Sequence, residues 1–120
     1  MKEIKAFEQA VENKVKDLSA EGINGTMFWA YQRSKECGNE LIDFSEVIWE
    51  KDVEAIVKTC KENDVKEFTI SSRMSDLINT LVEFEKFGCK MNGLTKVNAN
   101  YKNWQTQDYD IIPAIKMCIE

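Results

Sequence analysis

Apolar residues in the first part of the chain recur with the spacing of an amphipathic helix, about every three or four positions. This stripe consists of Ile4, Phe7, Val11, Val15 and Leu18. Lysine and glutamate cover the opposite face, and Gly22 is expected to end the helix. Thr26 then serves as the predicted N-cap of a second helix, which runs to Cys37 and stops at Gly38.

The next segment, LIDFSEVIW at residues 41–49, is compatible with two structures. Leu41, Phe44 and Ile48 have helical spacing, whereas residues 41–44 also suit a short strand. Asp52 is a good N-cap for the helix VEAIVKTCKEN, which is expected to end at Asn63–Asp64. The predicted buried face of that helix contains Val53, Ile56, Val57 and Cys60.

The second half of the chain predicts a strand, a helix and two further strands. VKEFTIS is a strand by composition, and Ser72 or Ser75 is expected to cap a helix that Gly88 terminates. The predicted apolar stripe of this helix, its core-facing side, consists of Leu77, Ile78, Leu81, Val82 and Phe84 or Phe87. Residues 66–99 therefore read as a strand–helix–strand unit, with a right-handed crossover if its strands are parallel.

The last two strands are expected to form an antiparallel pair around the polar loop NWQTQDYD. One predicted face of the first of these strands holds Met91, Thr95, Val97, Ala99 and Tyr101. The opposite face is polar and holds Lys96, Asn98, Asn100 and Lys102. Pro113 suits an edge position or the start of the final strand, because proline cannot donate to a ladder hydrogen bond.

Together these elements predict a single α+β domain over residues 1–120. The N-terminal helices precede a small mixed sheet, with strands near 66–71, 91–101 and 111–119, that packs against helices in two layers. The polar strand face argues against a doubly wound sheet that is covered on both sides.

Composition restricts the chemistry of the chain. Its 120 residues include no histidine, the commonest metal ligand and the usual near-neutral proton shuttle. The cysteines lie far apart without the paired spacing of a zinc site, and we expect them to be reduced core residues. They are Cys37, Cys60, Cys89 and Cys118. We therefore predict a protein that is not an enzyme and that binds neither a cofactor nor a metal.

The start of the chain, MKEIKAFEQAVENKVK, alternates in charge and lacks the apolar core of a signal peptide. No apolar stretch approaches the roughly 18 residues that a membrane span needs. We therefore expect a cytoplasmic protein without a membrane partner.

The net charge of −5 resides in one segment, residues 39–64, which carry eight carboxylates and three lysines. If residues 43–54 formed one helix, Asp43, Glu46, Glu50 and Glu54 would share a face, although an N-cap at Asp52 would split this row. Such a row suits a hard cation or a basic protein, but it lacks the spacing of an EF-hand loop and can equally be a solvated acidic face. The residues predicted to contact a protein partner are Asp43, Glu46, Glu50 and Trp104.

The alternative function is binding of a nucleotide or of single-stranded nucleic acid. Residues 96–109, KVNANYKNWQTQDY, interleave aromatic rings with amides and lysines, although they also suit an exposed strand face and hairpin loop. The turn after the strand that ends near residue 71 could hold a phosphate at a helix N-terminus, but neither glycine-rich phosphate motif is present. The candidate residues for this alternative are Ser72, Arg73, Lys96, Asn98, Tyr101 and Lys102.

Three segments resemble a family of small uncharacterised cytosolic proteins that are carried on mobile elements of gut Firmicutes. They are FWAYQRSKECGNELIDFSEVIW, VKEFTISS and GCKMNGLTKVNANYKNW, and the resemblance extends over residues 4–119. It brings no activity and no site residue. It implies only a mobile-element context. Our leading hypothesis is an accessory or inhibitor-like protein that acts by protein–protein contact, and the sequence does not define its oligomeric state.

Overall fold

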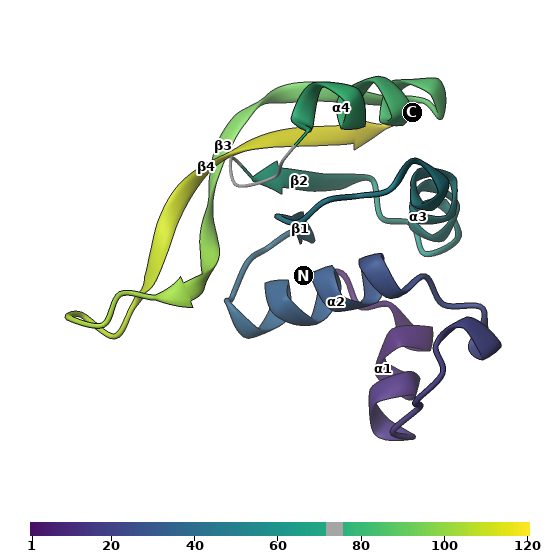
Figure 1. Ribbon diagram of the computed structural model, residues 1–120, viewed down its shortest axis with the longest axis horizontal. Coiled ribbons are helices and arrows are strands. Elements are labelled where there is room, and N and C mark those ends of the chain that lie inside the picture. The colour runs from purple at the N-terminus through teal and green to yellow at the C-terminus, as the bar shows by residue number, and fades with distance from the viewer. Residues whose placement is uncertain (72–75) are drawn as a thin grey trace.

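The computed structural model describes residues 1–71 and 76–120, with every side chain in these ranges except that of Asn100. Figure 1 shows the arrangement of the elements, which confirms the predicted α+β class. In chain order they are α1 (Lys5–Glu12), the 3-10 turn η1 (Ser19–Glu21), α2 (Gly25–Glu36), β1 (Asp43–Phe44), α3 (Glu50–Glu62), β2 (Glu67–Ser71), α4 (Leu77–Lys86), β3 (Cys89–Lys102) and β4 (Tyr109–Ile119).

The described strands form one mixed sheet in the order β1-β2-β4-β3. β1 pairs with β2 in parallel, whereas β4 pairs antiparallel with both β2 and β3. The predicted antiparallel pair at the end of the chain is therefore confirmed. β2 and β3 run parallel, which the strand–helix–strand prediction had left open, and β4 lies between them.

The segment at residues 41–49 contains the short strand β1, so the helical alternative is wrong. Asp43 lies opposite Thr69 and Phe44 lies opposite Ile70 in the parallel ladder. This register buries the Phe44 ring against Phe68, with 5.5 Å between the ring centroids. Burial of this aromatic pair favours the strand, and it separates Asp43 from the helix that carries Glu50 and Glu54.

The predicted helix caps Thr26 and Asp52 are both wrong, because their side chains contact each other instead. α2 is capped by Asn24, whose side chain accepts a hydrogen bond from the Met27 amide at 3.0 Å. α3 already begins at Glu50, so Asp52 lies in its first turn. The Asp52 carboxylate accepts hydrogen bonds from Asn24 Nδ2 at 3.1 Å and from Thr26 Oγ1 at 3.2 Å, which joins the starts of the two helices.

Helix α1 ends at Glu12, well before the predicted end at Gly22. Lys14 has a left-handed backbone (φ 53°), which interrupts the helix. Val15 and Leu18 still pack against the core, so the apolar stripe predicted burial better than it predicted secondary structure.

The centre of the core is a row of three phenylalanines from the sheet and α4. The ring of Phe68 lies 5.5 Å from that of Phe44 and 5.0 Å from that of Phe84. The predicted buried face of α3 is confirmed, since Val53, Ile56, Val57 and Cys60 are all buried. On α4 the prediction is wrong for Ile78 and Val82, which are exposed because Phe84 and Thr80 face the core instead.

A bulge in β3 changes which of its residues are buried. The register with β4 shifts between Met91 and Leu94, where Gly93 has a φ of +90° that suits glycine. Val97 and Ala99 are buried as predicted, whereas Met91 lies beyond the shift and is exposed. The predicted single face from Met91 to Tyr101 is therefore interrupted.

Pro113 lies inside β4, and the local backbone geometry explains why its missing N–H is tolerated there. Beyond the bulge, Lys96 pairs with Pro113 and Asn98 with Ile111. The backbone N–H and C=O of Asn98 bond to Asn39, away from β4, so by alternation the nitrogen of Pro113 points toward β2. The last β2–β4 pair among the described residues is Ser71 with Ala114, so Pro113 lies just past the described end of this ladder.

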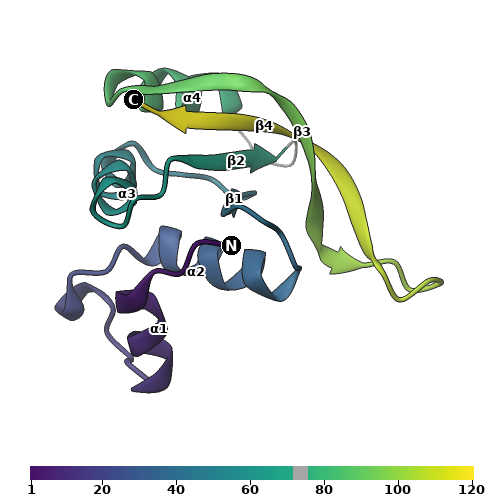
Figure 2. The same cartoon turned by 180° about the vertical axis from the view of Figure 1, so that it is seen from behind.

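The β3–β4 hairpin extends beyond the rest of the sheet and bends past the C-terminal end of α2, so that its tip projects from the body of the molecule, as both ribbon views show (Figures 1 and 2). Helices α1 and α2 lie together at the β1 side of the sheet, while α4 lies against the β3–β4 part (Figure 2). Within the described ranges, none of the helices combines the length and the apolarity that a membrane crossing requires.

Candidate functional site

The acidic residues predicted to form one partner surface are not brought together as an exposed row. Asp43 is only 7% exposed, within β1. Glu46 is exposed in the connection that follows and forms an ion pair with Arg33, with 3.8 Å between Oε1 and Nη1. Glu50 is exposed at the start of α3. Asp43 therefore belongs to the interior, and only Glu46 and Glu50 remain available to a partner.

Asp43 is the centre of a buried polar cluster. Its Oδ1 accepts a hydrogen bond of 2.7 Å from Thr69 Oγ1, and its backbone N–H donates to Ser34 Oγ at 2.8 Å. Burial raises the pKa of Asp43 from 3.8 to about 6, while the hydroxyls of Thr69 and Ser71 and the charge of Arg33 oppose part of this rise. The cluster links β1, β2 and α2 through polar groups that have little contact with water.

Ser71 completes this cluster in an unusual way. Its hydroxyl is fully buried and lowers the pKa of the Asp43 carboxyl. Among the described residues, however, it has no hydrogen bond of standard geometry. The predicted phosphate-binding residues Ser72 and Arg73, which come next in the chain, lie outside the described residues.

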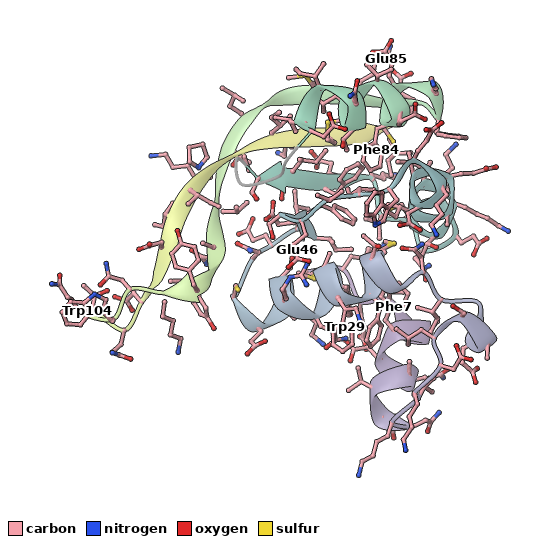
Figure 3. All side chains as sticks on the ribbon, viewed as in Figure 1. Phe7, Trp29, Glu46, Phe84, Glu85 and Trp104 are labelled. Atoms are coloured by element: carbon pink, nitrogen blue, oxygen red, sulfur yellow. The ribbon has the colours of Figure 1, made fainter. Side chains whose placement is uncertain are left out.

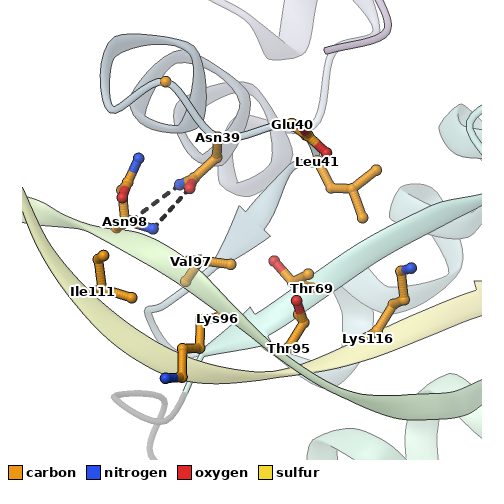
Figure 4. A pocket seen from close by; sticks show the side chains of 11 residues that line it. Asn39, Glu40, Leu41, Thr69, Thr95, Lys96, Val97, Asn98, Ile111 and Lys116 are labelled. Atoms are coloured by element: carbon orange, nitrogen blue, oxygen red, sulfur yellow. Dashed lines mark hydrogen bonds between the residues drawn. The ribbon is translucent and has the colours of Figure 1, made fainter.

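A pocket of about 430 Å³ lies between the loop after α2 and the sheet, as Figure 4 shows. Its volume is in the range of small-molecule and peptide side-chain sites. The loop contributes residues 38–41, β2 contributes Thr69, β3 contributes residues 95–98 and β4 contributes Ile111 and Lys116. The lining is mixed, with two lysines, Glu40 and several apolar side chains.

The Asn39–Asn98 latch holds the two sides of this pocket together. Asn39 Nδ2 donates to the backbone oxygen of Asn98 at 3.0 Å, and the Asn98 N–H donates to Asn39 Oδ1 at 2.8 Å (Figure 4). The Asn98 side chain adds a third bond, from Nδ2 to the backbone oxygen of Cys37 at 2.9 Å. These bonds keep the curled part of β3 against the end of α2.

The latch weakens the nucleic-acid alternative, because it uses the polar groups of Asn98, one of the residues predicted to contact a nucleotide. The amide of Asn98 is used by Cys37, and Lys102 Nζ lies 5.2 Å from the centre of the Tyr109 ring. Lys96 is exposed at the pocket, whereas Tyr101 lies further along β3. Lys96 and Asn98 therefore lie together at the pocket. The Asn98 side chain, however, is already hydrogen-bonded within the protein and has a structural role.

The tip of the β3–β4 hairpin presents Trp104 to solvent. The indole is 80% exposed and lies at the far end of the molecule from the helices (Figure 3). The loop beneath it is held by hydrogen bonds from the Asn103 N–H to the Asp108 oxygen at 2.7 Å and from the Gln107 N–H to the Asn103 oxygen at 2.8 Å. Gln107 Nε2 also donates to the Trp104 oxygen at 2.9 Å.

Asn39 was not among the residues that the sequence indicated, although it forms the latch. Asn39 stands in a short loop where asparagine is common, and its partner is 59 positions away along the chain. No local pattern marks such a residue, so only an observed pairing of the loop with β3 could have identified it.

Cys37, Cys60 and Cys89 have the environment of inert core thiols. Burial raises the pKa of Cys60 to about 12 and that of Cys89 to about 11, and burial also raises the pKa of Cys37. Cys118 is partly exposed. Within residues 1–71 and 76–120, no three carboxylates or thiols converge in a way that could hold a metal ion.

Comparison with known proteins gives a family for this architecture. Searches of curated proteins and of solved structures found no match to the chain. The model of the family described as "Domain of unknown function (DUF7698)" matches residues 26–119, from the start of α2 to the end of β4. Since this match covers well over half of the chain, the protein belongs to the DUF7698 family of domains of unknown function.

Proposed function

We propose that this protein works by binding another protein, and that the hairpin arm, defined as residues 101–110, provides the central contact. The observation that carries the proposal is the exposure of Trp104 at 80% on a loop that is already ordered by its own hydrogen bonds. Tryptophan is enriched among the residues that dominate binding energy at protein interfaces. A preordered loop loses little conformational entropy on binding, which favours affinity.

The other exposed tryptophans are less suited to this role. Trp29 packs edge-on against Phe28, with 5.1 Å between the ring centroids, so part of its ring already has a partner. Trp49 is the N-cap residue of α3, on the body of the molecule. Trp104 alone of these three stands on an extension that can enter a partner's recess.

The finer identity of the protein is also a proposal. We infer an accessory or inhibitor-like protein of a mobile element that acts on its partner in the cytoplasm. The resemblance to small proteins of mobile elements supports this role, and the acidic residues Glu46 and Glu50 would favour a partner with a basic surface.

Affinity capture with matched tryptophan variants tests the proposal. The full chain, Trp104→Ala and Trp49→Ala are immobilised separately, exposed to lysate of the native host, and the retained proteins are quantified by mass spectrometry. We expect a partner that the full chain and Trp49→Ala retain equally, and that Trp104→Ala retains about tenfold less, because an interface anchor has been removed. Equal retention by all three forms would show that the arm is not the contact.

The same lysate experiment separates the nucleic-acid alternative. If nuclease treatment removed the retained material, or if the double variant Lys96→Glu with Lys102→Glu lost a labelled single-stranded oligonucleotide that the full chain bound, nucleic-acid binding would replace our proposal. Such binding would also weaken steeply as salt is raised, since it depends on phosphate contacts.

A further inference from the structure

β3 is the last strand in the sheet order, so one of its edges has no neighbouring strand among residues 1–71 and 76–120. The latch shows which way this edge faces. The N–H and C=O of Asn98 point away from β4 and take the Asn39 carboxamide in place of a neighbouring strand. Asn39 therefore marks the direction in which an added strand would lie.

Leu94 and Lys96 also direct their backbone N–H and C=O groups away from β4, because these groups alternate in direction along an antiparallel strand. Residues from Leu94 to Asn98 pair with β4 in one continuous register, so every second residue has its backbone groups directed outward. The outward positions next to Asn98 are Lys96 and Leu94. Both side chains are exposed, and Leu94 is 81% exposed. The stretch is bounded by the bulge near Gly93 on one side and by the latch on the other.

The pocket of about 430 Å³ lies beside this same stretch. Thr95, Lys96 and Val97 form one wall, and residues 38–41 form the opposite wall. Side chains of an added strand alternate between the two faces of the sheet, so every second one could enter the pocket. Backbone bonds along an edge together with a side-chain pocket are the two features of recognition by strand addition.

Charge indicates the kind of segment that fits. β3 contains three lysines and no acidic residue, although the whole chain has a net charge of −5. Lys90 pairs with Glu120 at 3.0 Å, whereas Lys96 forms no ion pair with any residue that the structure describes. Lys96 therefore offers a positive charge at the centre of the open stretch.

We propose that β3 binds an extended, acidic segment of a partner protein as an added strand along Leu94–Lys96, with a side chain of that segment in the pocket. The proposal rests on the proposed protein-binding function and names the chemistry of the partner. A second copy of this chain fits less well. An antiparallel pair of β3 strands centred on Lys96 would place Lys96 opposite Lys96 and Lys90 opposite Lys102, which is repulsive.

Peptide binding tests this proposal with the full chain. The probe is a fluorescein-labelled peptide of about eight residues that alternates valine and glutamate, measured by fluorescence anisotropy. We expect saturable binding that Lys96→Pro weakens about tenfold, because proline removes the outward N–H. Lys96→Glu should also weaken binding, with a larger effect at low salt. Lys51→Glu, on α3, makes the same charge change away from the edge and should have no effect.

A modified peptide and a test of folding serve as controls for this experiment. The same peptide with N-methylated alternate amides should not bind, since it cannot pair with the edge. Circular dichroism and thermal unfolding of Lys96→Pro establish that the variant is folded, and Lys96→Glu provides the same test with the backbone intact. Absence of saturable binding up to about 1 mM, equal binding of the N-methylated peptide, or equal affinity in the folded Lys96→Pro variant would each overturn the proposal.

Trp104→Ala separates this proposal from the proposed function. A peptide of this length is expected to bind Trp104→Ala as it binds the unaltered chain, because the arm lies beyond the open stretch of β3. If Trp104→Ala loses the lysate partner but the peptide never binds, strand addition fails while the arm remains the contact. If the peptide binds as described and Trp104→Ala retains every lysate partner, the role of the arm fails instead.

Discussion

The Asn39 side chain pairs with the backbone of Asn98 in the way that a neighbouring strand would, through one donated and one accepted hydrogen bond of 3.0 and 2.8 Å. A carboxamide has the same donor and acceptor as a peptide group, so it can terminate an open sheet edge. This relationship holds the curled end of β3 against the loop after α2.

We therefore expect Asn39→Ala to lower the free energy of unfolding by about 2 kcal/mol, because two hydrogen bonds between partly buried groups are lost. Urea titration followed by circular dichroism measures the difference. Asn79→Ala is the matched control, since Asn79 is exposed and its amide donates to Asp76 in its own segment. Coincident unfolding midpoints for the two variants would contradict a stabilising role of the latch.

Asp43 predicts a pH dependence of stability. Burial raises the pKa of this carboxyl from 3.8 to about 6, so the folded protein holds the proton more tightly than the unfolded chain does. The protonated carboxyl therefore contributes its full stabilisation below about pH 4, and this contribution is lost as the pH rises through about 6. The free energy of unfolding lost in this way is about 3 kcal/mol.

Asparagine cannot ionise, and its oxygen can still accept the hydrogen bond from Thr69. We expect Asp43→Asn to gain stability relative to the unaltered chain between pH 4 and pH 7.5, as measured by urea unfolding at several pH values in that range. The comparison of the two proteins cancels the titration of the other carboxylates. A difference in stability that stays constant over this range would show that Asp43 ionises normally.

Tyr31 joins the N-terminal segment to α2. Its buried hydroxyl donates to Glu8 Oε1 at 2.7 Å and accepts from the Ile4 N–H at 3.2 Å, and burial raises its pKa to about 12. Tyr31→Phe should cost about 2 kcal/mol of unfolding free energy, because the Ile4 N–H stays buried without a partner. Hydrogen exchange should accelerate in residues 4–12, which lie outside the stretch that the family model matches.

Tyr109→Phe is the control for this substitution, because Tyr109 lies in the hairpin and is only partly buried. We expect its unfolding free energy to change by less than about 0.5 kcal/mol. Exchange in residues 4–12 that is equally fast in Tyr31→Phe and Tyr109→Phe would remove the proposed anchoring role of Tyr31.

The cysteines predict slow thiol chemistry in the folded protein. Since burial raises the pKa values of Cys37, Cys60 and Cys89, their thiolate fraction at pH 8 is small, and their sulfur atoms are shielded from reagents. Labelling with a chromogenic disulfide at pH 8 should be slow for these three, faster for Cys118, and fast for all four in denaturant. Rapid modification of Cys37 or Cys89 in the folded chain would instead indicate an activated thiol.

Local pattern was sufficient where burial follows one periodic face. The stripe of Val53, Ile56, Val57 and Cys60 predicted the buried side of α3, and the alternation of Val97 and Ala99 predicted the buried face of β3 beyond its bulge. It was not sufficient for the caps. Asp52 and Thr26 are both good cap residues by type, yet they bond to each other because α2 and α3 begin side by side.

By itself, the amino-acid sequence determined the α+β class, the antiparallel final hairpin and the absence of imidazole chemistry, because periodicity and composition act over short stretches of chain. Tertiary structure alone decided that Asp43 is buried beside Thr69, that β4 inserts between β2 and β3, and that Asn39 pairs with the edge of β3 at Asn98. These features depend on contacts between residues 26 or more positions apart, whose free energy no local pattern records.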